Sequence, residues 1–386
     1  MDRDLTQRLK DEASRIGFDR VGITPAAAPP TYPDFLEWLD SGHAAGMSYL
    51  EKNAAIRAHP EKLLEHARSI VMLSMVYGRR EPHDSGPSQG KVARYARGAD
   101  YHEVIWRRID ALLEWLRAER PEARGRAVCD TAPLLERDFA RLAGLGWVGK
   151  NTMLIDRKIG SFTFLGALIV DVELVPDPPH ETNHCGTCTR CLDACPTQAF
   201  PTPYTLDARK CISYWTIEHK GPIGESFADQ LDGWVFGCDI CQDVCPWNRK
   251  APPGRTADLD ANPALLNPDL INWLKQDAAV FRASIKNTAL SRAKRTGLLR
   301  NAALILGQRE VVEAVPALME RLDDDDPVVR DAAAWALRRI GTDEAKEALA
   351  CRQDTPSRDA RNAGGRRSDL GPDPFGTVGF TEIHFP

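Results

Sequence analysis

The sequence predicts an α+β protein built from several domains. At 386 residues the chain is longer than a single hydrophobic core usually serves. Predicted strands and helices alternate over about the first 170 residues, whereas the C-terminal third is rich in alanine and leucine and predicts helices alone. Between these two parts, residues 185–246 hold eight of the ten cysteines.

The composition is that of an ordinary globular protein, 43% hydrophobic and 27% charged. The sequence has no run of about eighteen apolar residues that could span a membrane, so we expect no membrane association. Its start is polar and lacks the apolar segment of a signal peptide. We therefore expect a cytoplasmic protein, where thiols stay reduced. The net charge of −5 argues against a chain that is basic throughout.

The N-terminal domain, expected over residues 1–178, is predicted from hydrophobic periodicity and β-branched runs. Helices are predicted at residues 1–18, 33–39, 60–67, 99–119 and 134–145, and strands at residues 20–24, 69–76, 127–129, 153–155 and 162–170. This alternation predicts an α/β domain around a largely buried sheet.

The cysteine spacing of the next domain, residues 179–250, points to two iron–sulfur clusters. The motifs are Cys185-x2-Cys188-x2-Cys191-x3-Cys195-Pro196, a lone Cys211, and Cys238-x2-Cys241-x3-Cys245-Pro246. In bacterial two-cluster ferredoxins, the cysteine before the proline binds the other cluster. This rule assigns Cys185, Cys188, Cys191 and Cys245 to one 4Fe–4S cluster. It assigns Cys195, Cys211, Cys238 and Cys241 to the second.

Two other interpretations of the cysteines remain open. Structural zinc is held by two separated pairs of ligands, often with histidine, and such sites lack triple runs that end in Cys-Pro. Disulfides are typical of small secreted chains, which this chain does not resemble. The spacing favours two clusters.

Residues 251–352 are predicted to form a helical domain with an internal repeat. The sequence 299–303, Leu-Arg-Asn-Ala-Ala, resembles residues 329–333, Val-Arg-Asp-Ala-Ala, and each was predicted to begin a helix ending at a glycine. Asp326 and Pro327 are typical of a helix N-cap and first turn. The pattern resembles HEAT repeats, with an ordinary helical bundle as the alternative. Residues 353–386 lack periodicity and are predicted to be disordered.

Three further motifs precede the cysteines. They are residues 94–102, Arg-Tyr-Ala-Arg-Gly-Ala-Asp-Tyr-His, then Asp130-Thr131, then residues 143–151, Ala-Gly-Leu-Gly-Trp-Val-Gly-Lys-Asn. Together with the double cluster motif, they resemble the epoxyqueuosine reductase family over about residues 1–350. The resemblance implies a cobalamin-binding N-terminal domain, two 4Fe–4S clusters, and removal of the epoxide oxygen from epoxyqueuosine at the wobble position of tRNA.

The resemblance also implies roles for individual residues. Asp130 would be the proton donor, which near neutral pH requires burial to raise the pKa of its carboxyl. The alternative for Asp130 is a helix N-cap. The residues that would contact cobalamin are Arg57, Ala93, Asp130, Leu154, Leu165, Ser213 and Asp239. Core packing is the alternative for the two leucines.

A basic stretch offers a candidate surface for RNA. Residues 278–309 contain no acidic residue, and phosphate binding requires a surface of one charge sign. The candidate contacts are Lys286, Arg292, Lys294, Arg295 and Arg300, with Lys220 from the cysteine-rich segment. A solvated helix face is the alternative.

Two other functions remain in competition at this point. One is a corrinoid reductive dehalogenase, which also joins a cobalamin domain to two clusters. The other is a ferredoxin-like electron-transfer protein without catalysis of its own, which the large N-terminal domain argues against. For the reductase we expect tRNA as substrate, an external low-potential electron donor, and a monomer.

Overall fold

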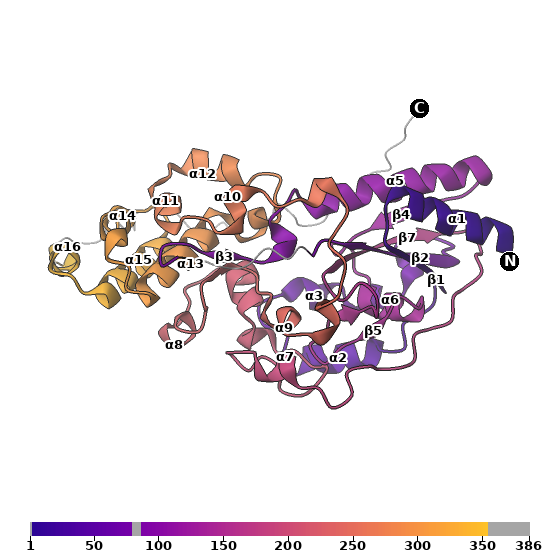
Figure 1. The fold of residues 1–386 in the computed structure, drawn as a ribbon, viewed down its shortest axis with the longest axis horizontal. Helices are drawn as coiled ribbons and strands as arrows, with labels where there is room; N and C mark the ends of the chain where they lie inside the picture. Colours follow the sequence, from indigo (N-terminus) through magenta and orange to yellow (C-terminus); the bar gives the residue numbers. More distant parts are fainter. Residues whose placement is uncertain (1, 79–85, 354–386) are drawn as a thin grey trace.

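The computed structural model describes residues 2–78 and 86–353. The predicted disorder of residues 353–386 falls almost entirely outside this range. Figure 1 shows the N-terminal sheet and its helices at one end of the long axis and the C-terminal helices at the other. The cysteine-rich segment lies between and below them in this view.

The N-terminal part is built on one antiparallel sheet of four strands in the order β1-β2-β7-β4. Its strands are β1 (Arg20–Pro25), β2 (Ser69–Val76), β7 (Thr163–Val170) and β4 (Gly125–Val128). Every residue of β2 is buried. Its side chains alternate between two apolar clusters, because successive residues of a strand point to opposite faces.

Helices cover both faces of this sheet, as the sequence predicts (Figure 1). Helices α1 (Arg3–Ile16) and α5 (Tyr101–Glu119) pack on one face, and α6 (Glu136–Leu142) packs on the other. The remaining N-terminal elements are α2 (Tyr32–Asp40), α3 (Ser48–Lys52), α4 (Ala54–Arg57), η1 (Pro60–Lys62), η2 (Arg94–Ala96) and the hairpin of β5 (Trp147–Val148) with β6 (Leu154–Ile155). The helix predicted at 60–67 is wrong beyond the short η1, because the chain turns at His66, whose φ is 62°.

The cysteine-rich segment has little regular structure. Its elements are α7 (Arg190–Asp193), η3 (Ala208–Lys210), a π-helical turn η4 (Tyr214–Glu218), α8 (Glu225–Ala228), β8 (Trp234–Phe236), α9 (Ile240–Asp243) and η5 (Pro246–Asn248). Helices α7 and α9 lie within the two halves of the cysteine motif, contain Cys191 and Cys241, and pack together. Strand β8 pairs in parallel with β3 (Lys91–Val92), which ties this segment to the N-terminal part.

The C-terminal part is helical, and its two longest helices pack against each other. The elements are η6 (Ala257–Leu259), α10 (Pro263–Leu266), α11 (Leu270–Lys275), α12 (Ala278–Ile285), η7 (Ala289–Ala293), α13 (Lys294–Gln308), η8 (Val312–Ala314), α14 (Val315–Arg321), α15 (Pro327–Ile340) and α16 (Asp343–Gln353). The predicted cap is confirmed, since the Asp326 carboxylate accepts the Val328 N–H. Helix α13 begins five residues before the predicted Leu299.

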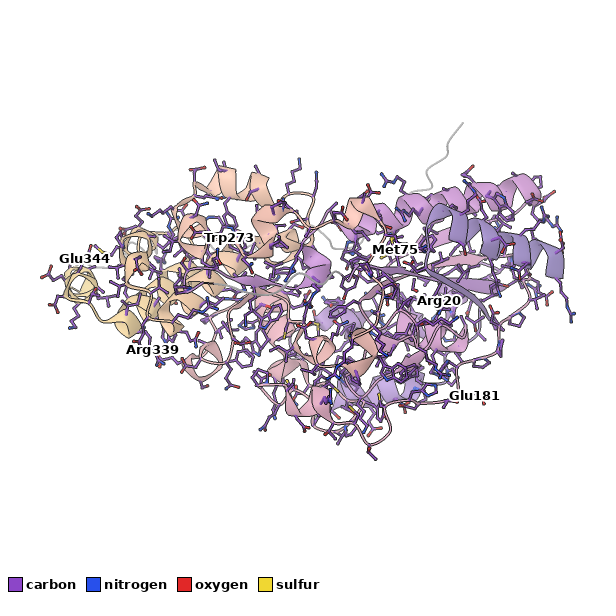
Figure 2. The ribbon with its side chains drawn as sticks, viewed as in Figure 1. Arg20, Met75, Glu181, Trp273, Arg339 and Glu344 are labelled. Carbon is purple, nitrogen blue, oxygen red and sulfur yellow. The ribbon has the colours of Figure 1, made fainter. Side chains whose placement is uncertain are left out.

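The apolar core is continuous between the parts. One cluster of buried residues runs from α1 through β8 to α15. Figure 2 labels Met75 of β2 and Trp273 of α11, which lie in this cluster in the two outer parts of the molecule. The domain boundaries at residues 178 and 250 therefore stay predictions. Among the described residues, no helix is long and apolar enough to cross a membrane.

Candidate active site

A cavity of about 370 Å³ lies where the N-terminal sheet meets the cysteine-rich segment. Strand β7 supplies Phe164 and Leu165 to its wall, and β6 supplies Leu154. The facing wall comes from the cysteine-rich segment and includes Ser213 and Ile217 around the π-helical turn. Such a volume, with mostly apolar walls and a few polar groups, is typical of a small-molecule or cofactor site.

Asp130 lies in the wall of this cavity, two residues after β4 ends. Its φ of 34° is in the left-handed region, which aspartate tolerates better than most side chains. The Glu136 carboxylate accepts the Asp130 backbone N–H at 2.6 Å, so the first residue of α6 holds the turn. The predicted alternative, in which Asp130 caps a helix, does not apply because α6 starts six residues later.

The Asp130 carboxylate is hydrogen-bonded to two neighbours on the first turn of α5. The Tyr101 hydroxyl donates to one oxygen, and His102 Nε2 lies 2.7 Å from the other. His102 Nδ1 lies 2.6 Å from the Asp100 carboxylate. Asp100 is also the N-cap of α5, so helix capping sets the position of the histidine.

These contacts determine the protonation of the site. Burial alone would lower the pKa of His102, but its bonds to Asp100 and Asp130 outweigh burial and raise that pKa to about 9. Burial pushes the pKa of Asp130 upward, but the contacts with His102 and Tyr101 outweigh it and lower that pKa. The expectation of a raised pKa at Asp130 is therefore wrong. A protonated His102 beside an ionised Asp130 holds the proton instead.

A second carboxyl in the cavity does have a raised pKa. Burial, aided by the nearby charge of Asp130, raises the pKa of Glu136 to about 8. Its carboxyl is therefore mostly protonated at neutral pH. Neither His102 nor Glu136 was among the predicted catalytic residues. The Asp100-Tyr101-His102 sequence contained the signal for the histidine, because a capping aspartate places its carboxylate beside the residue two positions later.

The surroundings of the cysteines support the crossed ligand scheme, whose two ligand sets stay a prediction. Burial and the neighbouring thiols of Cys245, Cys185 and Cys188 raise the pKa of Cys191 to about 11. Burial and the thiols of Cys185 and Cys188 also raise the pKa of Cys245.

The second group is Cys195, Cys211, Cys238 and Cys241. Burial raises the pKa of Cys238, and the thiols of Cys241 and Cys211 raise it further. All four of these cysteines line the cavity, whereas no member of the first group does. The two groups support the predicted ligand sets. The four thiols of the second set thus lie in the wall of the cavity that Asp130 also lines.

Comparison with known proteins decides the family. Residues 57–131 match the family model described as "Epoxyqueuosine reductase QueG, DUF1730", and residues 184–248 match the "4Fe-4S double cluster binding domain". The epoxyqueuosine reductase of Pseudomonas aeruginosa is 39% identical over 342 residues, which cover 87% of this chain and 95% of that protein. The chain belongs to the epoxyqueuosine reductase family.

Further comparisons support membership of the same family. The epoxyqueuosine reductase of Synechocystis is 43% identical over 69% of this chain and 91% of its own. Residues 288–365 match HEAT repeats. Two solved epoxyqueuosine reductases each have a TM-score of 0.85 and cover 93% of this chain and 96% of their own. One, 31% identical, is in complex with an epoxyqueuosine-modified tRNA stem loop. The other, from Bacillus subtilis and 29% identical, has its catalytic aspartate loop swung out of the active site.

The structure brings most of the predicted cobalamin contacts of this reductase-family chain together. Leu154, Leu165, Ser213 and Asp239 line the cavity with Asp130. The Asp239 carboxylate also accepts the backbone N–H and the guanidinium of Arg94, at 2.9 and 3.2 Å.

Two predicted contacts do not line the cavity. Ala93 is buried against Gly237 and donates its N–H to Phe236. Arg57 is buried behind the wall, donates to the Leu134 carbonyl, and has a buried Nε without a hydrogen-bond partner among the described residues.

Most of the predicted RNA contacts are occupied inside the protein. Arg300 is only 1% exposed, and its guanidinium donates to the carbonyls of Trp215, His219 and Gly221. The prediction that Arg300 contacts RNA is therefore wrong. The side chain instead fixes the end of the π-helical turn that forms part of the cavity wall.

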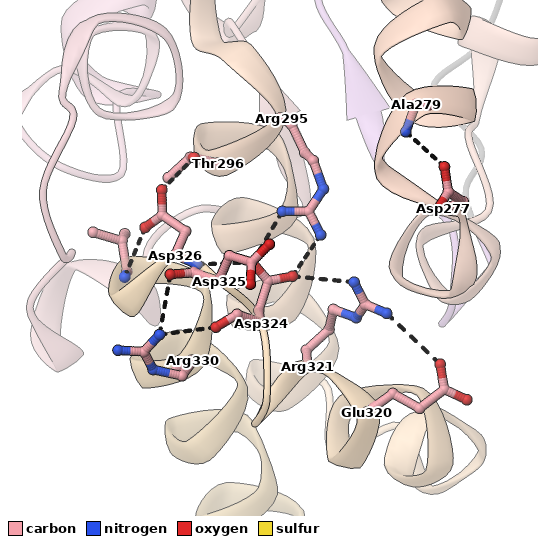
Figure 3. Close-up of polar contacts among 11 residues, drawn as sticks. Asp277, Ala279, Arg295, Thr296, Glu320, Arg321, Asp324, Asp325, Asp326 and Arg330 are labelled. Carbon is pink, nitrogen blue, oxygen red and sulfur yellow. Dashed lines mark hydrogen bonds and ion pairs between the residues drawn. The ribbon is translucent and has the colours of Figure 1, made fainter. Parts of the chain in front are cut away.

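Arg295 is also committed to an internal contact. Figure 3 shows its guanidinium on the Asp324 carboxylate, where Arg321 also converges. The Arg295 side chain is 13% exposed and that of Asp324 is 2% exposed. An RNA phosphate would have to displace a nearly buried ion pair to bind here. The prediction that Arg295 contacts RNA is therefore wrong, and its role is structural.

The remaining basic candidates lie closer to solvent. Arg292 is exposed but makes two 2.8 Å hydrogen bonds to Glu218. Lys220 donates to the carbonyls of Ile217 and Arg292. The side chains of Lys286 and Lys294 are exposed and make no hydrogen bond or ion pair within the described part of the chain. They are the stronger candidates for phosphate contacts.

Proposed function

We propose that this protein reduces the epoxide of epoxyqueuosine in tRNA to the alkene of queuosine. The observation that carries this function is the cavity that Asp130 shares with Cys195, Cys211, Cys238 and Cys241. The proposed proton donor and the proposed cluster ligands therefore border one small space. Family membership and the tRNA stem loop bound by a 31% identical relative support the same substrate.

The reaction fits the groups available. Removing the epoxide oxygen as water consumes two electrons and two protons, and iron–sulfur clusters deliver electrons singly. When bound, reduced cobalamin supplies a nucleophilic two-electron reductant between the clusters and the epoxide. The protein therefore has to bind the cofactor, exclude water and deliver protons.

The residues of the cavity fit the cofactors. Leu154 and Leu165 would contact the apolar parts of the corrin, with Ser213 and Asp239 on the side of the second cluster. Arg57 does not line the cavity, and its buried Nε lacks a hydrogen-bond partner among the described residues, so its assignment to the cofactor rests on the family resemblance. We assign the two cysteine groups described above to the two 4Fe–4S clusters.

Proton delivery is assigned to Asp130 and His102. The proton on His102 Nε2 passes to the Asp130 carboxylate along the 2.7 Å contact, and Asp130 passes it to the departing oxygen. The Asp100 carboxylate stabilises the charged imidazole from the other side. His102 is partly exposed, so it can take a second proton from water. Asp130 remains the immediate donor, and His102 is the group that reloads it.

We also propose the kind of electron donor, the oligomeric state, the cellular location and the tRNA contacts. The electron donor is an external low-potential carrier, the enzyme acts as a monomer, and it works in the cytoplasm. The exposed Lys286 and Lys294 contact tRNA phosphates.

The test combines cofactor binding with product analysis. Anaerobically reconstituted protein should retain cobalamin through gel filtration. With a chemical reductant, it should convert epoxyqueuosine in tRNA to queuosine, seen as loss of one oxygen in nucleoside mass spectra. A protein that does not retain cobalamin would fit the electron-transfer alternative. Retained cobalamin without conversion, together with dehalogenation of a bromophenol, would fit the dehalogenase alternative, which the family does not favour.

A further inference from the structure

The first cysteine group lies away from the cavity and close to the surface. Cys185, Cys188 and Cys191 are partly exposed, and the residues between them are mostly exposed. None of these cysteines lines the cavity that the second group borders. Electrons that reach the cavity from outside would therefore arrive at this loop. It is the side of the cluster pair where a donor can approach.

A second segment brings basic residues close to the loop. Arg157 and Lys158 lie on a tight turn closed by the pairing of Asp156 with Gly160. This turn packs on the chain after Cys245, because a Cβ at Gly160 would lie 2.2 Å from the side chain of Asn248. Asp156 is paired with Arg20, labelled in Figure 2, so its carboxylate does not offset the two cations.

An aromatic cluster joins this turn to the loop. Ile155, just before the turn, and its hairpin partner Trp147 pack with Cys245, Cys185 and Trp247. The turn and the first cysteine group therefore share one small hydrophobic core, which fixes the distance between them.

Two residues at the loop add a positive charge and an exposed aromatic ring. The Lys150 ammonium donates to the carbonyls of Gly186 and Cys188, which places its charge on the loop. Tyr204, whose N–H donates to the Lys150 carbonyl, is 45% exposed. Exposed aromatic residues beside basic ones are typical of protein interfaces.

Two more exposed cations lie beside the same cysteines in the chain. Arg190 precedes Cys191, and Lys250 lies between Asn248 and Ala251, against which Gly160 packs. Among the described residues, no acidic side chain forms an ion pair with Arg157, Lys158, Arg190 or Lys250. Two exposed acidic residues lie near the loop: Glu181, labelled at the lower right in Figure 2, and Asp193, whose carboxylate accepts the Thr189 hydroxyl within the cysteine motif.

We propose that this basic face, made by Lys150, Arg157, Lys158, Arg190, Tyr204 and Lys250, is where a small acidic one-electron carrier protein docks. The proposal rests on the proposed function and names its electron donor by chemistry. Complementary charge steers such carriers and orients them for transfer. A tRNA is the competing polyanion. It is disfavoured here because the cavity that would take its modified base is bordered by the other cysteine group.

The electron balance follows from this arrangement. Each reduced carrier loses one electron to the first cluster and leaves oxidised. Two carriers, together with two protons, account for one epoxide reduced to an alkene and one water. The face therefore has to release the oxidised carrier between the two transfers, which suits a small electrostatic interface.

The test uses the reconstituted holoenzyme and a purified acidic plant-type 2Fe–2S ferredoxin as probe. In the double variant Arg157→Glu/Lys158→Glu, bleaching of the cluster absorbance by reduced ferredoxin should slow by about tenfold or more at low salt. Reduction by dithionite should be unchanged. The control Arg3→Glu, an exposed charge reversal on α1, should match the wild type in both assays.

Equal ferredoxin rates in the double variant and the control would overturn the proposal. So would a loss confined to tRNA affinity, which would make the face an RNA surface. The proposed function is judged separately, by conversion of epoxyqueuosine in tRNA with dithionite as the reductant. Failure of that conversion in the wild type would refute the function, while the rate of cluster reduction would still report on docking.

Discussion

The contact between Arg295 and Asp324 gives a prediction that separates structure from RNA binding. The Asp324 carboxylate accepts hydrogen bonds from both terminal nitrogens of Arg295 (Figure 3). It accepts further hydrogen bonds from Arg321 at 3.0 Å and from the Asp326 N–H at 3.1 Å. Both side chains of the pair are nearly buried. The substitution Arg295→Met would remove the main ion-pair partner of the Asp324 carboxylate.

The size of the effect follows from burial. Removing one partner of a buried ion pair costs about 3–5 kcal/mol, whereas an exposed pair is worth about 0–1 kcal/mol. Because Arg321 still pairs with Asp324, we expect the lower end, about 3 kcal/mol. For a helical part of about 100 residues, a shift of about 4–8 °C per kcal/mol means that this loss lowers the Tm by about 12 °C or more. Lys294→Met, at the exposed neighbouring position, is the matched control and should change the Tm very little.

The assay is thermal unfolding of holoenzyme followed by circular dichroism, with tRNA affinity measured below the transition. Arg295→Met should lose stability and keep its tRNA affinity, and Arg295→Met/Asp324→Asn should be little worse than Arg295→Met alone. The pKa of Asp324 is lowered in the fold because its bonds to Arg295 and its other neighbours outweigh burial. This stabilisation is therefore present above the unfolded pKa and is lost as the pH falls through the lowered value. An unchanged Tm with weakened tRNA binding would refute the structural role.

Three other predictions concern the site and the RNA surface. Cys211→Ser should remove one cluster, about half of the protein-bound iron by the four-thiolate rule, and iron analysis showing no loss would reject the ligand set. His102→Gln should slow turnover by about 100-fold or more. The wild-type rate should decline as the pH rises through about 9 and His102 loses its proton, and the substitution should remove this decline. An unchanged pH–rate profile would exclude the relay. Lys286→Glu/Lys294→Glu should weaken tRNA binding and make its salt dependence shallower, and unchanged affinity would place the RNA elsewhere.

The sequence predicted a structural feature well where the residues that determine it lie close together in the chain. The β2 run is fully buried because it is apolar at every position but two, and the Asp326 cap forms through a bond two residues away. The cysteine spacing predicted two groups because the tight loops restrict which thiols can meet. Asp130 was identified through its motif, and the structure places it in the cavity wall.

The errors concern partners that are distant in the sequence. An acid-free stretch does not show that Arg295 will meet Asp324, 29 residues later, or that Arg292 will meet Glu218, 74 residues earlier. The burial of Arg300 depends on carbonyls more than seventy residues away. The sequence predicts a raised pKa for Asp130 because its immediate neighbours in the chain are apolar. In the structure, His102 and Tyr101 reach its carboxylate from α5 and lower that pKa.

The central claim is that Asp130 delivers protons in the cavity that receives the electrons. Its most direct test is one anaerobic turnover of Asp130→Asn on epoxyqueuosine-containing tRNA, followed by mass analysis of the nucleosides. The variant should retain cobalamin and the iron of both clusters, accept electrons as the wild type does, and leave the epoxide intact. Formation of queuosine at the wild-type rate would contradict the account.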